Sequence, residues 1–581
     1  MFRHMPLDGV IDTFLSVFNA VFFALAIIAT QVLFDAIAVA AGGGMSFAEC
    51  VRPLLILGGV TFGQQIMNGL HNFHGGSVMW LKARGVFGAI LQQKLQRIDP
   101  ANFEDVEFQD NLNKAKEGYA ALCMFAFIPI FIVTFYGTYF ATVGVYLFSL
   151  KPILLAVIML AFIPAMLAQI VRAKVFTKLE AESAPLRREH EYYQRTLTDR
   201  EYLKETRILG AFNFFHRLFM ESLSLLVKKT WQAERKTALL QLVLNVTSFA
   251  GMAVATYLLF TATMAGEISV GAFAAVFAAL GQIFYVMQEI ITQHIGGMNR
   301  DIGKVENYIR MLDMPEWTGD FAVPDYALGV VAEDVSFTYP GRDNAAVDGV
   351  SLTIAAGETI AIVGENGAGK STLVRLLCGI YRPSAGTVTA GGIGTAESAQ
   401  ASLYRRMSGV FQKYQRYKMT LSENVVISDV GALPHDRQRH HATADDGRIN
   451  AALKEAEFDT SDVPLDTMLS PEFGGIDLSG GLWQRLAIAR GLYRTSRFIV
   501  LDEPTAAIDP IEETRVYTQF QRLAAGKCAV VVTHRLGSAK LADRVVVMDG
   551  GKIVATGTHD ELVTRPGKYA EMWAAQAKWY G

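Results

Sequence analysis

The feature that most constrains this chain is a series of long apolar stretches before Pro315. They run over residues 12–41, 53–80, 119–148, 152–171, 237–264 and 270–293. Each approaches or exceeds the roughly 20 residues that a helix needs to cross a bilayer. Lipid offers no water to satisfy backbone N–H and C=O groups, so spanning segments of this length must be helical. We therefore expect a membrane bundle of six long transmembrane helices, of which the second is the most polar.

Composition agrees with a membrane protein and argues against a nucleic-acid partner. Hydrophobic residues make up 51% of the 581 residues and charged residues only 19%, whereas soluble domains average about 25% charged. A net charge of −3 lacks the basic signature of nucleic-acid binders. The four cysteines are far apart and form no CxxC pair, which argues against a metal cluster or a disulfide framework.

The distribution of basic residues predicts the orientation. Lysine and arginine gather between the second and third stretches and again between the fourth and fifth, whereas the other turns hold few. The positive-inside rule then places these loops and both termini in the cytoplasm of a multi-pass protein of the cell membrane. The loops are rich in Glu, Lys, Arg and Leu, so we expect them to extend the spans as helices. The first apolar stretch is too long for a signal-peptide core, which predicts a transmembrane helix there.

The pattern changes after Pro315, which predicts a second domain. We place the transmembrane domain at 1–315, a Pro- and Gly-containing linker at 316–329 and the second domain at 330–581. Short apolar, β-branched runs such as Thr359–Val363, Phe498–Leu501 and Ala529–Thr533 alternate with amphipathic segments there. Strands of this kind are typical of a parallel sheet covered by helices. The fold class is therefore a membrane α-helical bundle plus an α/β domain.

A glycine-rich loop follows the first of these strands. The sequence GENGAGKST has the spacing of a P-loop, whose backbone N–H groups face phosphates. Lys370 would reach the β- and γ-phosphates, and the Ser371 hydroxyl would bind Mg²⁺. The predicted nucleotide-binding residues of this loop are Gly364, Glu365, Asn366, Gly367, Ala368, Gly369, Lys370, Ser371 and Thr372.

Two carboxylates end a second strand, in the sequence FIVLDEP from Phe498 to Pro504. The carboxyl ends of strands are where α/β sheets bind ligands. We expect Asp502 to hold Mg²⁺ through a water molecule and Glu503 to polarise the attacking water.

The sequence LSGG at Leu478–Gly481 resembles the signature motif of ABC ATPases. Ser479, Gly480 and Gly481 would open a helix, whose free N–H groups suit a γ-phosphate. The resemblance extends along the whole chain to half-size ABC exporters, which have six spans followed by one ATPase domain. It implies a P-loop ATPase that uses ATP and Mg²⁺ and works as a domain-swapped dimer.

The resemblance also implies roles for four further residues. Tyr339 matches the aromatic residue that stacks on adenine, and Gln412 matches a glutamine that ligates Mg²⁺ and senses the membrane domain. His534 matches the histidine that contacts the γ-phosphate, and Asp509 matches an aspartate at the dimer interface. Leu482 departs from the glutamine common after LSGG, but this change removes no group that handles phosphate, metal or water.

One chain carries one P-loop and one signature, so the resemblance implies that the partner is a second copy of the chain, with a heterodimer possible. Short cytoplasmic helices at about 100–112 and 207–216 would couple the domains, through Phe103, Phe108, Phe212 and Phe215.

The predicted function is ATP-driven export of an amphiphilic substrate (a peptide or lipopeptide, a lipid, or a drug-like molecule) across the lipid bilayer by alternating access. A nucleotide-gated channel or sensory subunit, and a siderophore importer on an exporter scaffold, remain as alternatives.

Polar residues within the spans predict either a substrate path or hydrogen bonds between helices. They are Asn19, Gln31, Asp35, Gln64, Gln65, Asn68, Gln169, Asn245, Gln282, Gln288 and Glu289. Gln282, Glu289 and Gln293 have helical spacing, which predicts one stripe facing a central cavity. The alternative is that Glu289 lies beyond the bilayer and forms a cytoplasmic salt bridge.

Overall fold

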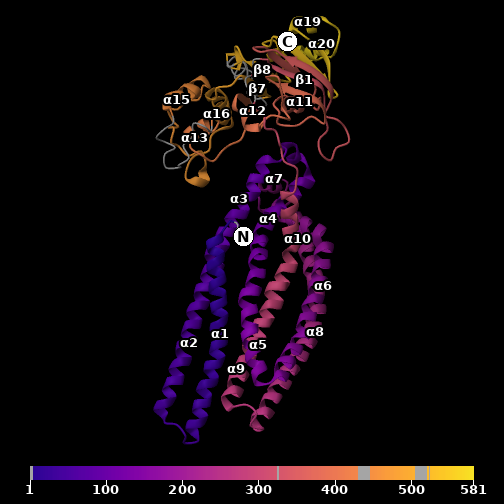
Figure 1. Ribbon diagram of the computed structural model, residues 1–581. Helices are drawn as coiled ribbons and strands as arrows, with labels where there is room; N and C mark the ends of the chain where they lie inside the picture. The colour runs from indigo at the N-terminus through magenta and orange to yellow at the C-terminus, as the bar shows by residue number, and fades with distance from the viewer. Residues whose placement is uncertain are drawn as a thin grey trace. The chain divides into compact units, whose positions relative to one another are not determined.

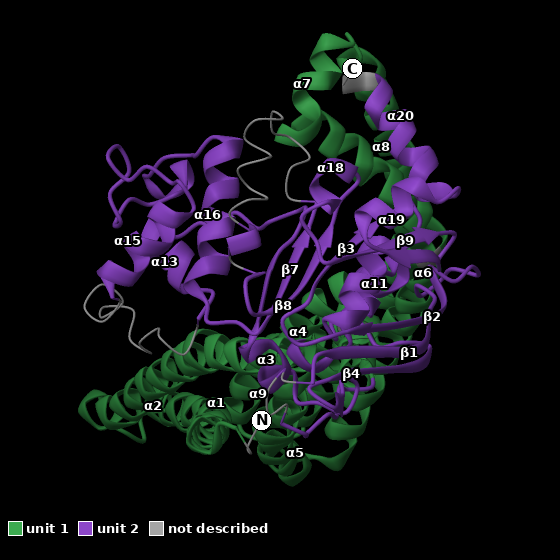
Figure 2. Cartoon of the chain, turned by 90° about the horizontal axis from the view of Figure 1, so that it is seen from above, with its two compact units in different colours: residues 1–95, 111–314 green, residues 96–110, 315–581 purple. Residues whose placement is uncertain are grey.

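The computed structural model describes residues 4–322, 326, 328–429, 445–503, 520–522 and 524–580. The chain forms two compact units, which Figure 2 colours separately. Unit 1 comprises residues 1–95 and 111–314, and unit 2 comprises residues 96–110 and 315–581. The short segment 96–110 thus belongs to unit 2, although long helices of unit 1 flank it in sequence.

Unit 1 is built from helices (Figure 1). They are α1 Pro6–Ala41, α2 Phe47–Phe73, α3 Trp80–Arg97, α4 Val106–Phe131, α5 Thr138–Leu150, α6 Pro152–Thr198, α7 Arg200–Ile208, α8 Phe212–Met264, α9 Val270–Glu289 and α10 Gly296–Leu312. Three π-helical turns, η1 His74–Met79, η3 Ile132–Gly137 and η4 Ile290–Ile295, join α2 to α3, α4 to α5 and α9 to α10.

Five helical runs among the described residues are long and apolar enough to cross a membrane: 6–41, 106–150, 152–180, 212–264 and 270–312. They contain five of the six predicted spans. The remaining stretch, 53–80, is also helical, in α2 and η1, but it is not one of these runs. Its glutamine, asparagine and histidine residues reduce its hydropathy. Helices α6, with 47 residues, and α8, with 53, continue well past the length of a span, which confirms the predicted helical extensions.

Helix α1 packs on α2 and α9, and α6 packs on α8 along much of their length (Figure 1). Small residues such as Ala20, Ala255 and Ala272 are fully buried in the core of this unit, beside Tyr139 and Leu259. Small side chains let helix backbones approach closely, as is usual in membranes.

Several polar residues of the spans bond to other helices. Asp35 accepts hydrogen bonds from the Ser269 hydroxyl and the Gly271 backbone N–H at the start of α9, at 3.0 and 2.8 Å. The Tyr146 hydroxyl donates to Gln31 at 2.7 Å. Hydrogen bonding between helices, rather than a substrate path, therefore accounts for Gln31 and Asp35.

The stripe of Gln282, Glu289 and Gln293 stays a prediction. The π-helical turn η4 begins directly after Glu289 and interrupts the 3.6-residue period. Gln293 is exposed, whereas Gln282 and Glu289 are half-buried.

Unit 2 contains two sheets and the helices that cover them. The six-stranded sheet has the order β10-β9-β3-β8-β7-β6, and all neighbours from β9 to β6 are parallel. Its strands are β3 Thr359–Val363, β6 Met407–Val410, β7 Phe498–Asp502, β8 Cys528–Val532, β9 Arg544–Asp549 and β10 Lys552–Gly557. The predicted strands and the parallel sheet are thereby confirmed. The antiparallel sheet, β2-β1-β4-β5, comprises β1 Val330–Phe337, β2 Val347–Ile354, β4 Ala385–Ala390 and β5 Ile393–Gly394.

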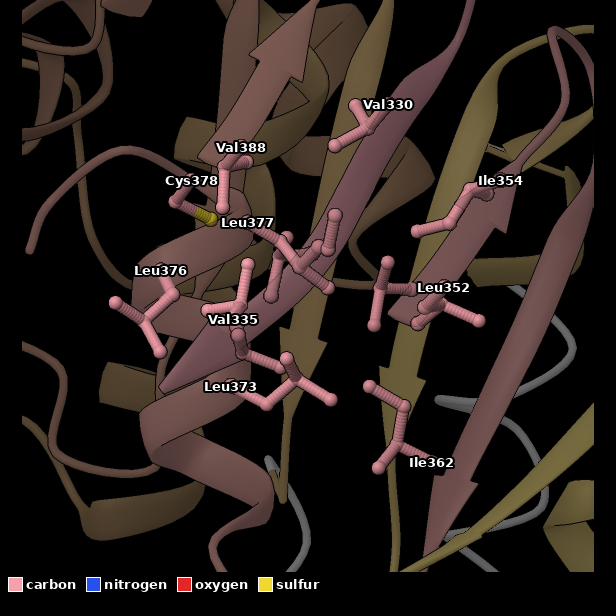
Figure 3. Packing of buried hydrophobic residues seen from close by; sticks show 14 of the residues in the cluster. Val330, Val335, Leu352, Ile354, Ile362, Leu373, Leu376, Leu377, Cys378 and Val388 are labelled. Atoms are coloured by element: carbon pink, nitrogen blue, oxygen red, sulfur yellow. The ribbon is translucent and has the colours of Figure 1, made fainter. Parts of the chain in front are cut away.

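Among the described residues, the helical elements of unit 2 are η2 Pro100–Glu104, α11 Lys370–Leu377, α12 Gln400–Arg405, α13 Leu421–Val426, α15 Asp446–Glu455, η7 Pro471–Phe473, α16 Gly480–Tyr493, α18 Leu536–Ala539, α19 His559–Thr564 and α20 Lys568–Tyr580. Helix α11 packs between the sheets. Figure 3 shows its Leu373 and Leu377 beside Val335 of β1 and Ile362 of β3, all fully buried. This core holds the start of α11 rigidly.

The two predicted coupling segments differ in structure from the expectation. Segment 100–112 contains the short helix η2 and then the start of α4, and Ala101 is buried in the core of unit 2. The short helix expected at 207–216 is instead α7, which ends at Ile208. Gly210 adopts a positive φ of 64° there, which reverses the chain and lets α8 begin at Phe212.

Candidate functional site

The glycine-rich loop connects β3 to α11 and has a backbone that only glycine accommodates at two points. Gly364 has φ 153° and Gly369 has φ 93°. A Cβ at Gly364 would lie 2.2 Å from the Met548 carbonyl oxygen, and one at Gly369 would lie 2.3 Å from that of Ala346. The loop therefore curls tightly against its neighbours and turns straight into α11, as a phosphate-binding loop requires.

Lys370 is buried at the first residue of α11. Its Nζ donates hydrogen bonds of 3.0 Å to the carbonyl oxygens of Gly364 and Glu365. The same Nζ lies 3.8 Å from Oε1 of Glu503. The lysine charge is thus held inside the loop, where a phosphate would meet it.

Glu503 is the centre of the site. It directly follows β7, whose five residues are all buried, and has a positive φ of 42°, which is uncommon for a residue other than glycine. Its Oε2 accepts a 3.2 Å hydrogen bond from Gln412, and its Oε1 lies 3.8 Å from Nδ1 of His534. The structure thus brings Lys370, Gln412 and His534 together around one carboxylate.

The two adjacent carboxyl groups of the site have opposite pKa shifts. The His534 imidazole, and then the charge of Lys370, hold the pKa of Glu503 below its usual value. Burial raises the pKa of Asp502, and the charge of Glu503 acts in the same direction. Glu503 is therefore ionised at neutral pH and able to accept a proton, whereas Asp502 needs a cation to compensate its buried charge.

A magnesium ion fits this corner by the chemistry of its donors. The Ser371 hydroxyl donates to Oδ1 of Asp502 at 3.1 Å, and Gln412 reaches the adjacent Glu503. Hydroxyl, carboxylate and amide oxygens are the donors that Mg²⁺ prefers. Ser371, Gln412 and Asp502 would hold the ion.

The signature residues lie elsewhere in unit 2. Ser479 caps α16 by accepting a hydrogen bond from the Leu482 N–H at 3.3 Å, so Gly480 and Gly481 begin the helix as expected. Gly480 accepts a hydrogen bond from the Tyr414 hydroxyl at 3.0 Å. Within the described parts of the chain, no hydrogen bond or ion pair joins these three residues to the P-loop or to Glu503.

Tyr339 is half-buried and close to the P-loop helix. Its hydroxyl lies 2.9 Å from Oγ1 of Thr372 and accepts a hydrogen bond from Arg375 at 3.2 Å. Arg375 also donates to the Tyr381 hydroxyl at 3.0 Å, and that hydroxyl donates to Glu104 of η2 at 2.7 Å. A chain of polar contacts thus links the predicted adenine-stacking residue to segment 96–110.

Sequence reasoning missed Glu104, Arg375 and Tyr381. Arg375 lies one helical turn after Ser371, which is a local signal. Glu104 had no such signal, because its partner Tyr381 is 277 residues away in sequence.

The predicted interface residue Asp509 lies outside the described residues. Glu365, Asn366 and Gly367 form the exposed tip of the P-loop, and Ala368 is buried behind them.

Comparison with known proteins identifies an ABC transporter family domain over residues 347–506. This range includes the P-loop, Gln412, the signature and both carboxylates of β7, but not Tyr339, Asp509 or His534. The whole fold is similar to that of a bacterial Atm1-family ABC exporter with ATP bound. The two superpose with a TM-score of 0.79 over 98% of this chain and 99% of the other, at 23% identity.

The curated relatives include proteins named for two kinds of transport. The chain is 29% identical to the subtilin transport ATP-binding protein SpaT of Bacillus subtilis, over 66% of this chain and 62% of that protein. It is 33% identical to the ATP-dependent lipid A-core flippase of Methylococcus capsulatus, over 58% of this chain and 54% of that protein. It is 31% identical to the nisin transport ATP-binding protein NisT of Lactococcus lactis, over 42% of this chain and 40% of that protein. The match therefore spans less than two thirds of each of these relatives.

Proposed function

We propose that this chain, which joins an ABC transporter domain to a membrane region in the exporter fold, hydrolyses ATP to export an amphiphilic substrate across the cell membrane. The observation that carries the proposal is the convergence of Lys370, Gln412 and His534 on Glu503. Such a carboxylate, ionised and held between a lysine and a histidine, suits a base that activates water for phosphoryl transfer.

In this mechanism the P-loop backbone and Lys370 bind the β- and γ-phosphates of ATP. Glu503 orients the attacking water and accepts its proton, while His534 contacts the γ-phosphate. Tyr339 would stack on the adenine. When bound, Mg²⁺ would neutralise phosphate charge. Phosphoryl transfer depends mostly on such positioning and charge stabilisation.

We also propose that the working unit is a dimer of two copies of this chain. Ser479, Gly480 and Gly481 have no bond to the P-loop within the described residues, so a second copy would supply them to complete each site. Asp509 would lie at the same interface. The coupling role of segments 100–112 and 207–216, through Phe103, Phe108, Phe212 and Phe215, belongs to the same proposal.

The relatives support a proposal for the substrate class. Relatives of this chain are named for the transport of subtilin and nisin and for the flipping of lipid A-core. We therefore propose an amphiphilic peptide or lipid as cargo. The domain limits of 1–315, 316–329 and 330–581 and the cytoplasmic placement of both termini belong to the same proposal.

The test uses the purified chain alone in liposomes. We expect Mg²⁺-dependent ATPase activity, and Glu503→Gln should reduce turnover at least about 100-fold while ATP binding persists. Glu333→Gln, which alters an exposed carboxylate of β1, is the matched control. Near-normal turnover of Glu503→Gln would contradict the catalytic assignment. An inert chain that needs a different subunit would contradict the homodimer.

Direction is tested with a fluorescent phospholipid and the cationic dye ethidium in vesicles of defined orientation. Export predicts movement away from the ATPase side, in step with ATP hydrolysis. Movement toward that side would favour the importer, and flux without sustained hydrolysis would favour the channel.

A further inference from the structure

The last helix of the chain contacts the loop that carries His534. On α20, the Gln576 side-chain amide donates to the His534 carbonyl oxygen at 2.5 Å. The amide oxygen of the same side chain accepts from the Leu536 N–H at 2.9 Å. One side chain therefore binds the backbone on both sides of Arg535, as a neighbouring strand would.

The helix that carries Gln576 is firmly anchored. Tyr569 is fully buried and its hydroxyl lies 2.7 Å from Nδ1 of His559, while Trp573 packs against the His559 ring at 4.8 Å. Both side chains join a core cluster that includes Val363 of β3 and Leu536. Residues 569, 573 and 576 recur at the spacing of one helical face. Gln576 is thereby held at a defined position against the loop.

The first residue of the same helix contacts the P-loop. Lys568 Nζ lies 2.6 Å from Oε1 of Glu365 and 3.9 Å from Asp549. Helix α20 thus joins the phosphate-binding loop to the histidine loop, the two segments that must keep their spacing around a γ-phosphate.

We propose that Gln576 is a positioning residue for His534, an inference that rests on the proposed ATPase function. Its two hydrogen bonds hold the backbone of residues 534–536, and this sets the place of the imidazole, 3.8 Å from Glu503. Without them the loop gains freedom, and His534 no longer meets the γ-phosphate in one geometry. Displacement of a catalytic group by about 1 Å can reduce a rate by about 100-fold.

The experiment measures kcat and KM for ATP with the full-length chain in liposomes. Gln576→Leu keeps the size of the side chain and removes both hydrogen bonds. We expect kcat to fall about 10-fold or more, with KM changed less than about twofold. Gln576→Glu keeps the acceptor for the Leu536 N–H and loses the donor, so its kcat should be intermediate. Lys578→Leu, an exposed change on the same helix, is the control and should match the unchanged chain.

A double-mutant cycle separates positioning from general support of the fold. In a His534→Ala background, Gln576→Leu should lower kcat by less than about twofold, because the group that it positions is gone. An equal loss in both backgrounds, or a normal kcat in Gln576→Leu, would overturn the inference. If Gln576→Leu does not fold, Gln576→Glu takes its place in the cycle. An unchanged chain without ATPase activity would refute the proposed function instead.

Discussion

The Ser371 hydroxyl donates a 3.1 Å hydrogen bond to Oδ1 of Asp502, which lies 131 positions later in the chain. Ser371 lies in the first turn of α11 and Asp502 ends β7, so the packing of helix on sheet brings these oxygens together. Two oxygens at this distance form part of the expected metal site.

This pair predicts the magnesium dependence of the ATPase. Ser371→Ala removes one proposed ligand and leaves Asp502 in place, so the free Mg²⁺ needed for half-maximal activity should rise about 10-fold or more. The measurement is ATPase rate against buffered free Mg²⁺, with Ser384→Ala, a serine outside the site, as control. An unchanged Mg²⁺ requirement would show that Ser371 is not a ligand.

The contact of Glu104 with Tyr381 and Arg375 predicts an effect on nucleotide affinity. Glu104→Gln weakens the polar chain that reaches the Tyr339 hydroxyl, and loss of one such hydrogen bond corresponds to a roughly 2- to 10-fold rise in KM for ATP. The kcat should stay close to normal, since Glu503 and its partners are untouched. Glu107→Gln changes an exposed carboxylate three residues away and should leave KM unaltered. Equal KM values for ATP in the unchanged chain, Glu104→Gln and Glu107→Gln would show that Glu104 does not affect nucleotide binding.

His559 predicts a pH dependence of stability. Burial lowers the pKa of His559, so the unfolded state binds the proton more tightly than the folded state. Neutral His559 therefore contributes fully to the free energy of unfolding above the ordinary histidine pKa of about 6.5. The stability of the fold decreases as the pH drops below that value. His559→Gln should flatten this dependence.

The measurement is the urea midpoint of the full chain between pH 8 and 5.5. His216→Gln, an exposed histidine change, should retain the original slope. If the urea midpoint of His559→Gln changes with pH as much as that of the unchanged chain, the titrating group is not His559.

Glu289 predicts an effect on transport rather than on hydrolysis. It ends α9 half-buried and hydrogen-bonds Tyr136, whose hydroxyl also lies 2.9 Å from Nε2 of His294. Glu289→Gln keeps the shape but removes a charge that would attract a cationic cargo, so ethidium transport should fall while basal ATPase stays normal. Parallel dye-transport and ATPase assays in the same liposomes provide the check. Unchanged ethidium transport would make the residue purely structural.

Local sequence patterns determined the individual helices, strands and motifs of this protein. The length of an apolar stretch is enough to predict a membrane span, because a backbone in lipid must satisfy its own hydrogen bonds. Strand, glycine turn and helix N-terminus follow one another within the P-loop, so Gly364 to Thr372 could be placed on their elements without coordinates. The same holds for Ser479 at the start of α16 and for the carboxylates that end β7.

Tertiary structure decided which residues meet. Gln412 and His534 reach Glu503 only because strands from distant parts of the chain lie in one parallel sheet, and no local pattern encodes that order. Glu104 and Gln576 act on partners 277 and 42 residues away through single side chains, without a motif of their own. The π-helical turn after Glu289 also went unpredicted, since a one-residue change of helical period follows from packing against neighbouring helices. Periodicity and motifs are short-range properties, whereas contacts between distant residues depend on the packing of the whole core.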